Sequence, residues 1–346
     1  QSVLVFARRL FFSDRMTTTA TKTAIILMNT GSPSAPTEVA VRAYLREFLS
    51  DRRIIELPAW FWQPILNRVI LPKRPAKSAE RYRQVWMPEG SPLVVHMNRV
   101  ARELRARLPE PITVETAMRV GFPDVNETMG RLRAAGFERF LFWPLFAQYS
   151  TQTTESALDA VREYMAAQSQ SLNWGVIGAY WDSPGFIEAL AKVVETYRTP
   201  EHHLVMSFHG IPYASIQKGS PYERHCLGTA ERLAQALDIG PKDFSIAYQS
   251  RFGKGRWLQP YLTEHVEQLL RSGIDKLDVA CLSFSVDCLE TLEEIGIELK
   301  KHFLAAGGKE LHLLPCMNAE EAALSFYQKH IEEAVAKFDI LTPKKE

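Results

Sequence analysis

The sequence is poor in cysteine, in net charge and in long apolar runs, and each shortage excludes a class of protein. Four cysteines occur among 346 residues, with no CxxC pair, which argues against structural zinc and against a disulfide framework. The net charge of +1 does not indicate a nucleic-acid partner. No run approaches the roughly 18 apolar residues that a membrane-spanning helix needs.

Phosphate-binding and hydrolase motifs are missing as well. The chain contains no GxxxxGK(S/T) loop and no GxGxxG after its first predicted strand, so we expect no bound nucleotide. It also lacks the GxSxG elbow of serine hydrolases. Its composition, 46% hydrophobic and 23% charged, is typical of globular proteins, and its length suits two domains.

Three short segments of the first half recur in the same order in the second half. In each pair an apolar strand breaks into a loop, and helical patterns follow. Strands that alternate with helices predict βαβ units and parallel sheets. We therefore expect an α/β fold of two similar doubly wound, Rossmann-like domains whose parallel sheets face a common cleft. The paired segments are 24–33 with 203–212, 114–123 with 244–253, and 139–156 with 276–291.

The alternation of strands and helices also predicts the domain limits. Residues 1–22 stand apart as an extension, either an arginine-rich targeting segment or an addition upstream of Met16, and we expect them to be disordered or a non-native start. We expect a first domain at residues 23–172, with an insertion at 56–90, and a second domain at 173–319. A C-terminal helix at 320–346 is expected to pack back on the first domain.

The insertion is dense in proline and aromatic residues and has no counterpart in the second half. Trp60 and Trp62 lie in it, and Lys73, Arg74 and Lys77 follow closely. One interpretation is ordinary core. An apolar patch beside basic residues is more typical of a binding lip or a membrane-facing surface, which is what we expect here.

His209 follows the apolar run LVMSF and precedes Gly210. Such a run predicts a buried parallel strand, and ligands of parallel sheets bind beyond the carboxyl ends of the strands. Histidine is also the side chain most easily tuned for proton transfer near neutral pH. The alternative is that His209 only ends a strand and bonds a backbone carbonyl.

A second group of chemically active residues is acidic. Asp287 and Glu290 have the spacing of a capping box, with Asp287 as the N-cap. Glu290, Glu294 and Glu298 recur every four residues, which predicts a row of carboxylates on one helix face. Because like charges at this spacing repel, the row favours an entry path for a divalent cation over a purely structural role.

Four ordered motifs together resemble those of the ferrochelatase family, whose members insert ferrous iron into protoporphyrin. The motifs are ILMNTGSP with VRAYLREFLSDRRII, YRQVWMPEGSPL, SFHGIP with GSPY, and VDCLETLEEIGIE, and the match runs over about residues 25–320. The resemblance implies two similar domains around a porphyrin cleft. It also implies a lyase that releases protohaem and two protons in the terminal step of haem biosynthesis.

The resemblance further implies roles for individual residues. His209 matches the family's metal-site histidine, and Glu290 matches its acidic partner in catalysis and metal contact. Glu294 and Glu298 match acidic residues of a metal or proton path. The implied substrate-binding residues are Arg74, Tyr82 and Ser91 at the propionates, and Asn29, Arg119 and Trp257 in the cleft lining, to which the flat side chain of Tyr149 is added as a candidate wall.

The chain departs from the family pattern at two places. Cys288 stands where many relatives have histidine, which leaves the role of Cys288 open. Some relatives hold an iron–sulfur cluster through a QYSC stretch and C-terminal cysteines, whereas here Thr151 takes the first position and no cysteine follows Cys316. We expect no iron–sulfur cluster and no permanently bound cofactor, with Fe2+ as a substrate.

Two other functions stay open at this point. One is a chelatase for another tetrapyrrole, coproporphyrin III or sirohydrochlorin, although the hydrophobic insertion favours protoporphyrin IX. The other is a porphyrin carrier without turnover, against which the presence of both His209 and Glu290 argues. We expect a cytoplasmic protein that contacts the inner membrane peripherally, through the basic and aromatic insertion.

Overall fold

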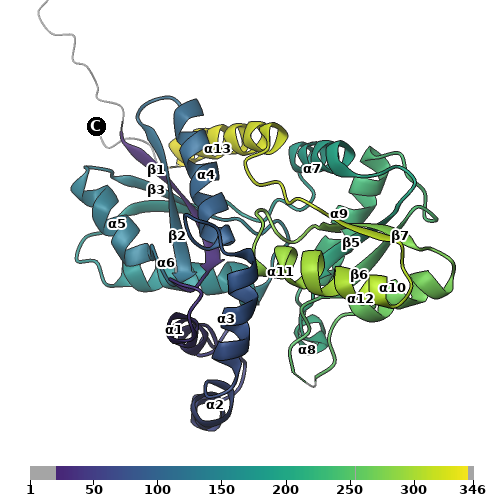
Figure 1. Cartoon of the computed structure of the whole chain (residues 1–346). Coiled ribbons are helices and arrows are strands. Elements are labelled where there is room, and N and C mark those ends of the chain that lie inside the picture. Colours follow the sequence, from purple (N-terminus) through teal and green to yellow (C-terminus); the bar gives the residue numbers. More distant parts are fainter. Residues whose placement is uncertain (1–20, 254, 342–346) are drawn as a thin grey trace, which may run out of the picture.

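The computed structural model describes residues 21–253 and 255–341, so the predicted N-terminal extension lies outside it up to residue 20. Within these ranges the chain forms two parallel sheets of four strands each. Figure 1 shows the sheets in two neighbouring halves, the first in purple to teal and the second in green. The two halves have the same strand order, β2-β1-β3-β4 and β6-β5-β7-β8.

The first half begins with a strand that is buried along nearly its whole length, because it pairs on both sides. Its elements are β1 (Thr23–Gly31), α1 (Glu38–Phe48), α2 (Ala59–Ile65), the π-helical turn η1 (Leu66–Ile70), α3 (Arg74–Val85), α4 (Pro92–Arg107), β2 (Ile112–Val120), α5 (Val125–Ala134), β3 (Arg139–Pro144), the π-helical turn η2 (Thr151–Glu155), α6 (Ser156–Ala166) and β4 (Asn173–Val176).

The second half repeats this plan with fewer helices between its first two strands. Its elements are α7 (Pro184–Tyr197), β5 (His203–His209), α8 (Tyr213–Gln217), α9 (Tyr222–Ala236), β6 (Phe244–Gln249), α10 (Leu262–Arg271), β7 (Lys276–Cys281), α11 (Leu289–Leu292), the π-helical turn η3 (Glu294–Leu299), α12 (Lys300–Ala305), β8 (Glu310–Leu314) and α13 (Glu321–Leu341).

The equal strand order confirms the predicted α/β fold of two similar halves. The three recurring segments are β1 with β5, β2 with β6, and β3 with β7, and each pair holds the same place in its sheet. The predicted division between residues 172 and 173 is wrong by one strand. β4 pairs with β3 through partners such as Phe140 and Trp174, so the first sheet extends to Val176.

Helices cover both faces of each sheet. The largest core joins the two halves, because it contains buried side chains from α4, α7, α9 and α13 as well as from both sheets. Smaller cores fill the outer faces, with α5 and α6 on the first sheet and α10 and α12 on the second. α13, drawn in yellow in Figure 1, lies against α4 and α7. α13 therefore contacts one helix of each half, and through α4 it packs on the first half as predicted.

The insertion forms a helical lobe of α2, η1 and α3 that packs on α1. In Figure 1 α2 lies at the bottom of the molecule, away from both sheets. Trp62 is buried and its Nε1 donates to the carbonyl oxygen of Leu49 at 2.6 Å, so the expectation that it lies on an exposed lip is wrong. Trp60 is 80% exposed. Among the described helices, none combines the length and apolar character that crossing a membrane demands.

Candidate functional site

His209 ends β5, where it is paired with Gln249 of β6. Its Nδ1 lies 2.6 Å from the carbonyl oxygen of Gly210, and its backbone N–H donates to the Ser283 hydroxyl at 2.7 Å. A bond to a backbone carbonyl is what a purely structural histidine would make, but it engages only one of the two ring nitrogens. The carbonyl oxygen can only accept, so Nδ1 is the donor, and in the neutral ring the lone pair lies on Nε2. It is therefore available to accept a proton or contact a metal.

Gly210 lets an aromatic wall approach the backbone beside His209. A Cβ at Gly210 would lie 3.0 Å from the carbonyl oxygen of Gln249 and 3.3 Å from Cε3 of Trp257. Both distances are tighter than most Cβ contacts, so a side chain here would have to displace Trp257 or the Gln249 carbonyl by a few tenths of an ångström. Trp257 also forms an isolated bridge with Pro212. The structure thus brings the predicted wall residue Trp257 next to His209.

The helix that carries Glu290 begins one residue later than predicted. α11 has Cys288 as its N-cap and Thr291 at N3, so the predicted capping box of Asp287 and Glu290 is wrong. The Asp287 carboxylate is engaged elsewhere, because it accepts from Asn318 Nδ2 at 2.7 Å and from the Thr291 hydroxyl at 2.8 Å. The N3 position of the capping box is therefore held by Thr291 and not by Glu290.

Cys288 supports this helix start from a buried position. Its backbone N–H donates to the Thr291 hydroxyl at 3.1 Å, which completes the capping box. Burial raises the pKa of the Cys288 thiol well above its usual range, and the nearby Glu290 carboxylate raises it further. The thiol therefore stays protonated near neutral pH, which suits a structural cap better than a metal ligand.

Glu294 begins η3 and is bound twice by Ser250. The Ser250 N–H and hydroxyl donate to its two carboxylate oxygens, each at 2.7 Å. Burial raises the pKa of Glu294, the Ser250 hydroxyl and His209 act in the opposite direction, and Glu290 raises it again. We call His209, Glu290 and Glu294 the His209 cluster, because these electrostatic interactions join them. Ser250 has a φ of 65°, and strained backbone of this kind gathers at functional sites.

Glu298 does not continue the row of Glu290 and Glu294. The segment is π-helical, with a bond from the Glu298 N–H to the carbonyl oxygen of Glu293 at 2.8 Å, so residues five apart share a face. Arg81 of α3 accordingly binds both, at 2.5 Å from Glu293 and 2.8 Å from Glu298. The side chain of Glu298 is 52% exposed. The prediction of three aligned carboxylates is therefore wrong for the third.

Arg74 lies at the start of α3, close to the His209 cluster. Its guanidinium is 4.5 Å from the centre of the Phe252 ring. Burial lowers the pKa of Arg74, and so does Arg81, while the Glu290 carboxylate raises it. Tyr44 shares this environment, because its pKa is raised first by burial and then by Glu290. The helical lobe thus contributes a cation, and the adjoining α1 a phenol, beside Glu290.

The other two residues predicted to bind propionates, Tyr82 and Ser91, are buried. Tyr82 is 6% exposed and packs edge-on against Trp86. Ser91 is 4% exposed and accepts a hydrogen bond from the Ser32 hydroxyl at 2.5 Å. Burial raises the pKa of Tyr82 well above its usual range, with smaller contributions from Tyr44 and Glu290. Tyr82 therefore shares the electrostatic environment of Glu290, whereas Ser91 contacts Ser32 and no residue of the His209 cluster among the described contacts.

The three remaining predicted residues lie around the first sheet. Asn29 donates to the sulfur of Met97 at 3.7 Å, and Arg119 Nε donates to Asp51 at 3.1 Å. The backbone N–H of Tyr149 donates to His225 Nδ1 at 3.2 Å. None of these described partners is shared with His209, Glu290 or Glu294. The structure therefore does not join these three side chains to the His209 cluster.

Sequence reasoning missed several residues that build the site. They are the partners that hold or adjoin the predicted ones: Tyr44, Arg81, Gln249, Ser250, Phe252 and Ser283. A usable signal existed for Gln249 and Ser250, because both stand at the carboxyl end of a predicted strand, where ligands of parallel sheets bind. Gln249 donates to the backbone oxygen of Glu290 at 2.7 Å. Because it is also the strand partner of His209, it links the segment of His209 to the segment of Glu290.

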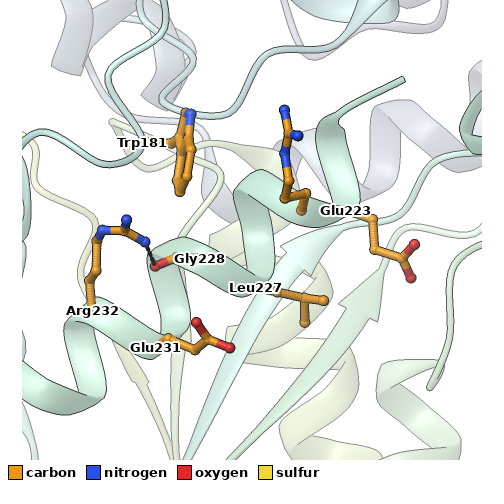
Figure 2. A pocket seen from close by; sticks show the side chains of 7 residues that line it. Trp181, Glu223, Leu227, Gly228, Glu231 and Arg232 are labelled. Atoms are coloured by element: carbon orange, nitrogen blue, oxygen red, sulfur yellow. Dashed lines mark hydrogen bonds between the residues drawn. The ribbon is translucent and has the colours of Figure 1, made fainter. Parts of the chain in front are cut away.

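A surface hollow of about 410 Å³ lies on the outer side of α9, between Trp181 and Arg232. Figure 2 shows Arg232 bonded to the carbonyl oxygen of Gly228, with Glu223 and Glu231 directed outward from the helix. Arg232 also lies 5.0 Å from the centre of the Trp181 ring. None of the residues that line the hollow belongs to the His209 cluster, so we do not assign the chemistry to it.

Comparison with known proteins identifies the family. The model of the ferrochelatase family matches residues 22–335. This chain belongs to the ferrochelatase family. A ferrochelatase of Azoarcus sp. (strain BH72) is 41% identical over 327 residues, which cover 93% of this chain and 90% of that protein. Those of Aromatoleum aromaticum and Herminiimonas arsenicoxydans are each 44% identical, covering 87% of this chain and 84% and 83% of theirs.

Solved structures show the same fold at much lower identity. SirB from Bacillus subtilis with Fe3+ is 10% identical, has a TM-score of 0.56 and covers 91% of this chain and 96% of its own. The sirohydrochlorin chelatase SirB from Bacillus subtilis subspecies spizizenii in complex with cobalt has a TM-score of 0.54 at 11% identity, with the same coverage. The chain is thus a ferrochelatase, a metal-inserting lyase of haem biosynthesis, whose family acts on ferrous iron and a porphyrin.

Proposed function

We propose that this ferrochelatase inserts Fe2+ into protoporphyrin IX and that His209 and Glu290 carry out the exchange of metal for protons. The observation that supports this most is the tautomer of His209. Its Nδ1 donates to the Gly210 carbonyl, so in the neutral ring Nε2 is the nitrogen that can act as a base. Glu290 and Glu294 lie close enough to interact with one another, and Glu294 interacts with His209.

The reaction requires two protons to leave the macrocycle as the dication enters. A flat porphyrin hides its nitrogen lone pairs, so binding energy that buckles the ring exposes them. His209 Nε2 then accepts a pyrrole proton, and the carboxylates of Glu290 and Glu294 balance the charge of Fe2+ while it loses water. The products are protohaem and two protons, and no electron is transferred.

Glu294 suits a relay role within this scheme. Burial raises its pKa, which brings a carboxyl group closer to the pH at which it can both accept and release a proton. Glu298 is held by Arg81 at the surface, so we place it at the outer entrance and not at the metal. This arrangement assigns the inner exchange to the His209 cluster and leaves Glu298 a minor role.

Arg74 is the candidate for binding a propionate, because a guanidinium offers a rigid fork to a carboxylate. Its present neighbour is the ring of Phe252, so a propionate would replace a weak contact. Trp257 beside Gly210 offers a flat surface for the macrocycle. For Tyr82, Ser91, Asn29, Arg119 and Tyr149 we propose a place in the wall, where they hold the residues that touch the substrate.

We also propose that the protein binds no iron–sulfur cluster and has no permanent cofactor. Thr151 and the absence of cysteine after Cys316 support this. Acid-labile sulfide, measured on protein purified without oxygen, tests it. Sulfide in stoichiometric amounts would contradict the proposal, and its absence together with full turnover would support it.

We further propose a cytoplasmic location with peripheral membrane contact through the helical lobe. Trp60, Phe61 and Val69 are 80%, 48% and 53% exposed, and Lys73 and Lys77 are exposed beside them. Each basic residue near an anionic bilayer contributes about 1 kcal/mol, so the contact should be weak and sensitive to salt. The same surface would admit a hydrophobic porphyrin from the membrane.

A single assay separates these proposals from the alternatives. The protein is incubated without oxygen with Fe2+ and, in turn, protoporphyrin IX, coproporphyrin III and sirohydrochlorin, while the absorption spectrum is recorded. We expect the highest kcat/KM with protoporphyrin IX. A higher value with coproporphyrin III or sirohydrochlorin would overturn the choice of substrate, and binding without spectral change would indicate a carrier.

A further inference from the structure

The second half carries another cluster of ligand-type side chains, at the opposite end of its sheet from His209. His202 directly precedes β5, Asp278 lies on β7 and His312 lies on β8, where the strand register places Asp278 beside His312. His209 closes β5 at its other end. At about 3.3 Å per residue, the strand places this cluster roughly 20 Å from His209.

The three side chains converge on one oxygen atom. Oδ1 of Asp278 lies 2.9 Å from His202 Nδ1 and 3.3 Å from His312 Nδ1, and one ligand atom from each residue lies within 4.8 Å of the others. Nitrogen and oxygen ligands about 2.0–2.1 Å from a tetrahedral metal lie about 3.3 Å from one another. The spacing therefore matches a metal site after small rotations of the side chains.

The surroundings favour a cation at this place. The Asp278 and His202 side chains are 0% and 2% exposed, and both ion-pair partners that the described residues give Asp278 are imidazoles. The backbone N–H of Thr199 donates to Oδ2 at 2.5 Å, which leaves Oδ1 directed at the two rings. A buried carboxylate is costly unless it is paired, hydrogen-bonded or bound to a metal, so a cation between the two rings would be stabilised by Oδ1 in addition to the contacts with Thr199 and His202.

We propose that His202, Asp278 and His312 bind a divalent first-row transition-metal ion, separate from the iron that is the substrate. Two imidazoles and a carboxylate are the ligand set that zinc and ferrous iron accept. Glu310 faces the opposite nitrogens of both rings, with Oε2 at 3.6 Å from His202 Nε2 and 3.8 Å from His312 Nε2. Oε1 of Glu310 pairs with Lys276 at 2.6 Å, so Oε2 is the oxygen that would approach a ring nitrogen as the outer carboxylate of a carboxylate–histidine–metal arrangement.

Such an ion would join three segments that are distant in the sequence. It would link the loop before β5 to β7 and β8, and its fourth position would face the solvent beside His312, whose side chain is 43% exposed. Because the ion binds only the folded chain, it would stabilise the second half without taking part in iron insertion. The site is thus a structural clamp, on residues outside the His209 cluster.

Zinc titration of the full chain tests the proposal. Protein treated with a chelator is titrated with Zn2+ in a calorimeter, and its melting temperature is measured with and without Zn2+. The variants are His312→Ala, His209→Ala, and His302→Ala as the matched control. His302 is 44% exposed and pairs with Glu267 at 2.8 Å, so it resembles His312 but lacks a third ligand.

We expect His312→Ala to lose one equivalent of bound Zn2+ and the rise in melting temperature that zinc produces. Its affinity should fall by more than about 100-fold, since even loss of an outer-shell partner reduces metal affinity by 10–100-fold. His302→Ala and His209→Ala should keep that equivalent. If His312→Ala melts early without metal, His312→Gln, which keeps a hydrogen-bonding group near Asp278, repeats the test.

Two results would overturn the proposal. One is equal zinc stoichiometry and affinity in wild type and His312→Ala. The other is that wild type binds only the zinc that His209→Ala abolishes, which would mean that the contacts with Thr199 and His202 satisfy Asp278 without a metal. Neither result would affect the proposed role of His209, because that role is read from iron insertion.

Discussion

Replacement of Glu294 by glutamine removes a buried negative charge and retains both hydrogen bonds to Ser250. The introduced amide oxygen accepts from the Ser250 N–H, and the amide nitrogen donates to the hydroxyl. Burial raises the pKa of Glu294 in the folded protein, so ionisation of this group opposes folding. We therefore expect Glu294→Gln to be more stable than wild type at pH 7 and slower in iron insertion.

The size and sign of the effect follow from linkage. Each unit by which folding raises a pKa corresponds to about 1.4 kcal/mol at a pH above both values. About 1 kcal/mol shifts the melting temperature of a domain of 150–250 residues by about 2–4 °C. The wild-type carboxyl is neutral in both states below its ordinary pKa of 4.5. The advantage of the variant should therefore appear above that pH, grow through the raised pKa and then stay constant.

Calorimetric melting of both proteins from pH 4 to pH 8, with iron insertion measured in parallel, checks this reasoning. Glu298→Gln is the matched control, because Glu298 is half exposed and lies in the same π-helical segment, and exposed substitutions usually stay within about 0.5 kcal/mol. A difference in melting temperature that does not depend on pH would refute the assignment of a buried charge to Glu294. Wild-type turnover in Glu294→Gln would refute its place in the proton path.

Four further outcomes are expected. His209→Ala should lower kcat for iron insertion by at least about 10²-fold, the usual loss for a general base, with unchanged circular dichroism; retention of a tenth of the activity would exclude that role. Glu290→Gln should reduce turnover as strongly and leave the melting temperature nearly unchanged, because Cys288 and Thr291 form the cap. Trp60→Ser should raise KM for protoporphyrin and reduce co-sedimentation with anionic liposomes, and an unchanged KM would contradict the lip. Arg74→Ala should weaken porphyrin binding in a fluorescence titration more than Lys77→Ala does, and the reverse order would remove Arg74 from the propionate site.

The fold was predictable because its signals are local. Each central strand is a short apolar run bounded by turn residues, and the recurrence of three segments in one order predicted two halves before any contact was known. β4 was assigned to the wrong half because its four residues, NWGV, are only partly buried or exposed. An edge strand of this kind has no apolar run, and only its pairing with β3 places it.

The site was predictable only in part, because its details depend on contacts between distant segments. His209 and Glu290 stood out through their position at strand and helix ends. The capping box failed because Asn318, some thirty residues away, binds the Asp287 carboxylate. The row of carboxylates failed because a π-helical turn directs Glu298 to Arg81. No periodicity in the sequence announces either contact.

The position of α13 makes the core of the first half depend on a helix that lies after the second half in the sequence. Trp143 of β3 is fully buried, and rings of Phe326 and Tyr327 on α13 lie 6.3 and 5.6 Å from it. Both rings belong to α13, which follows the strands of the second half in the sequence. A first half without α13 would therefore lack these two ring contacts with Trp143. The two similar halves share one hydrophobic core, so a fragment cut at the boundary after Val176 would have an incomplete core.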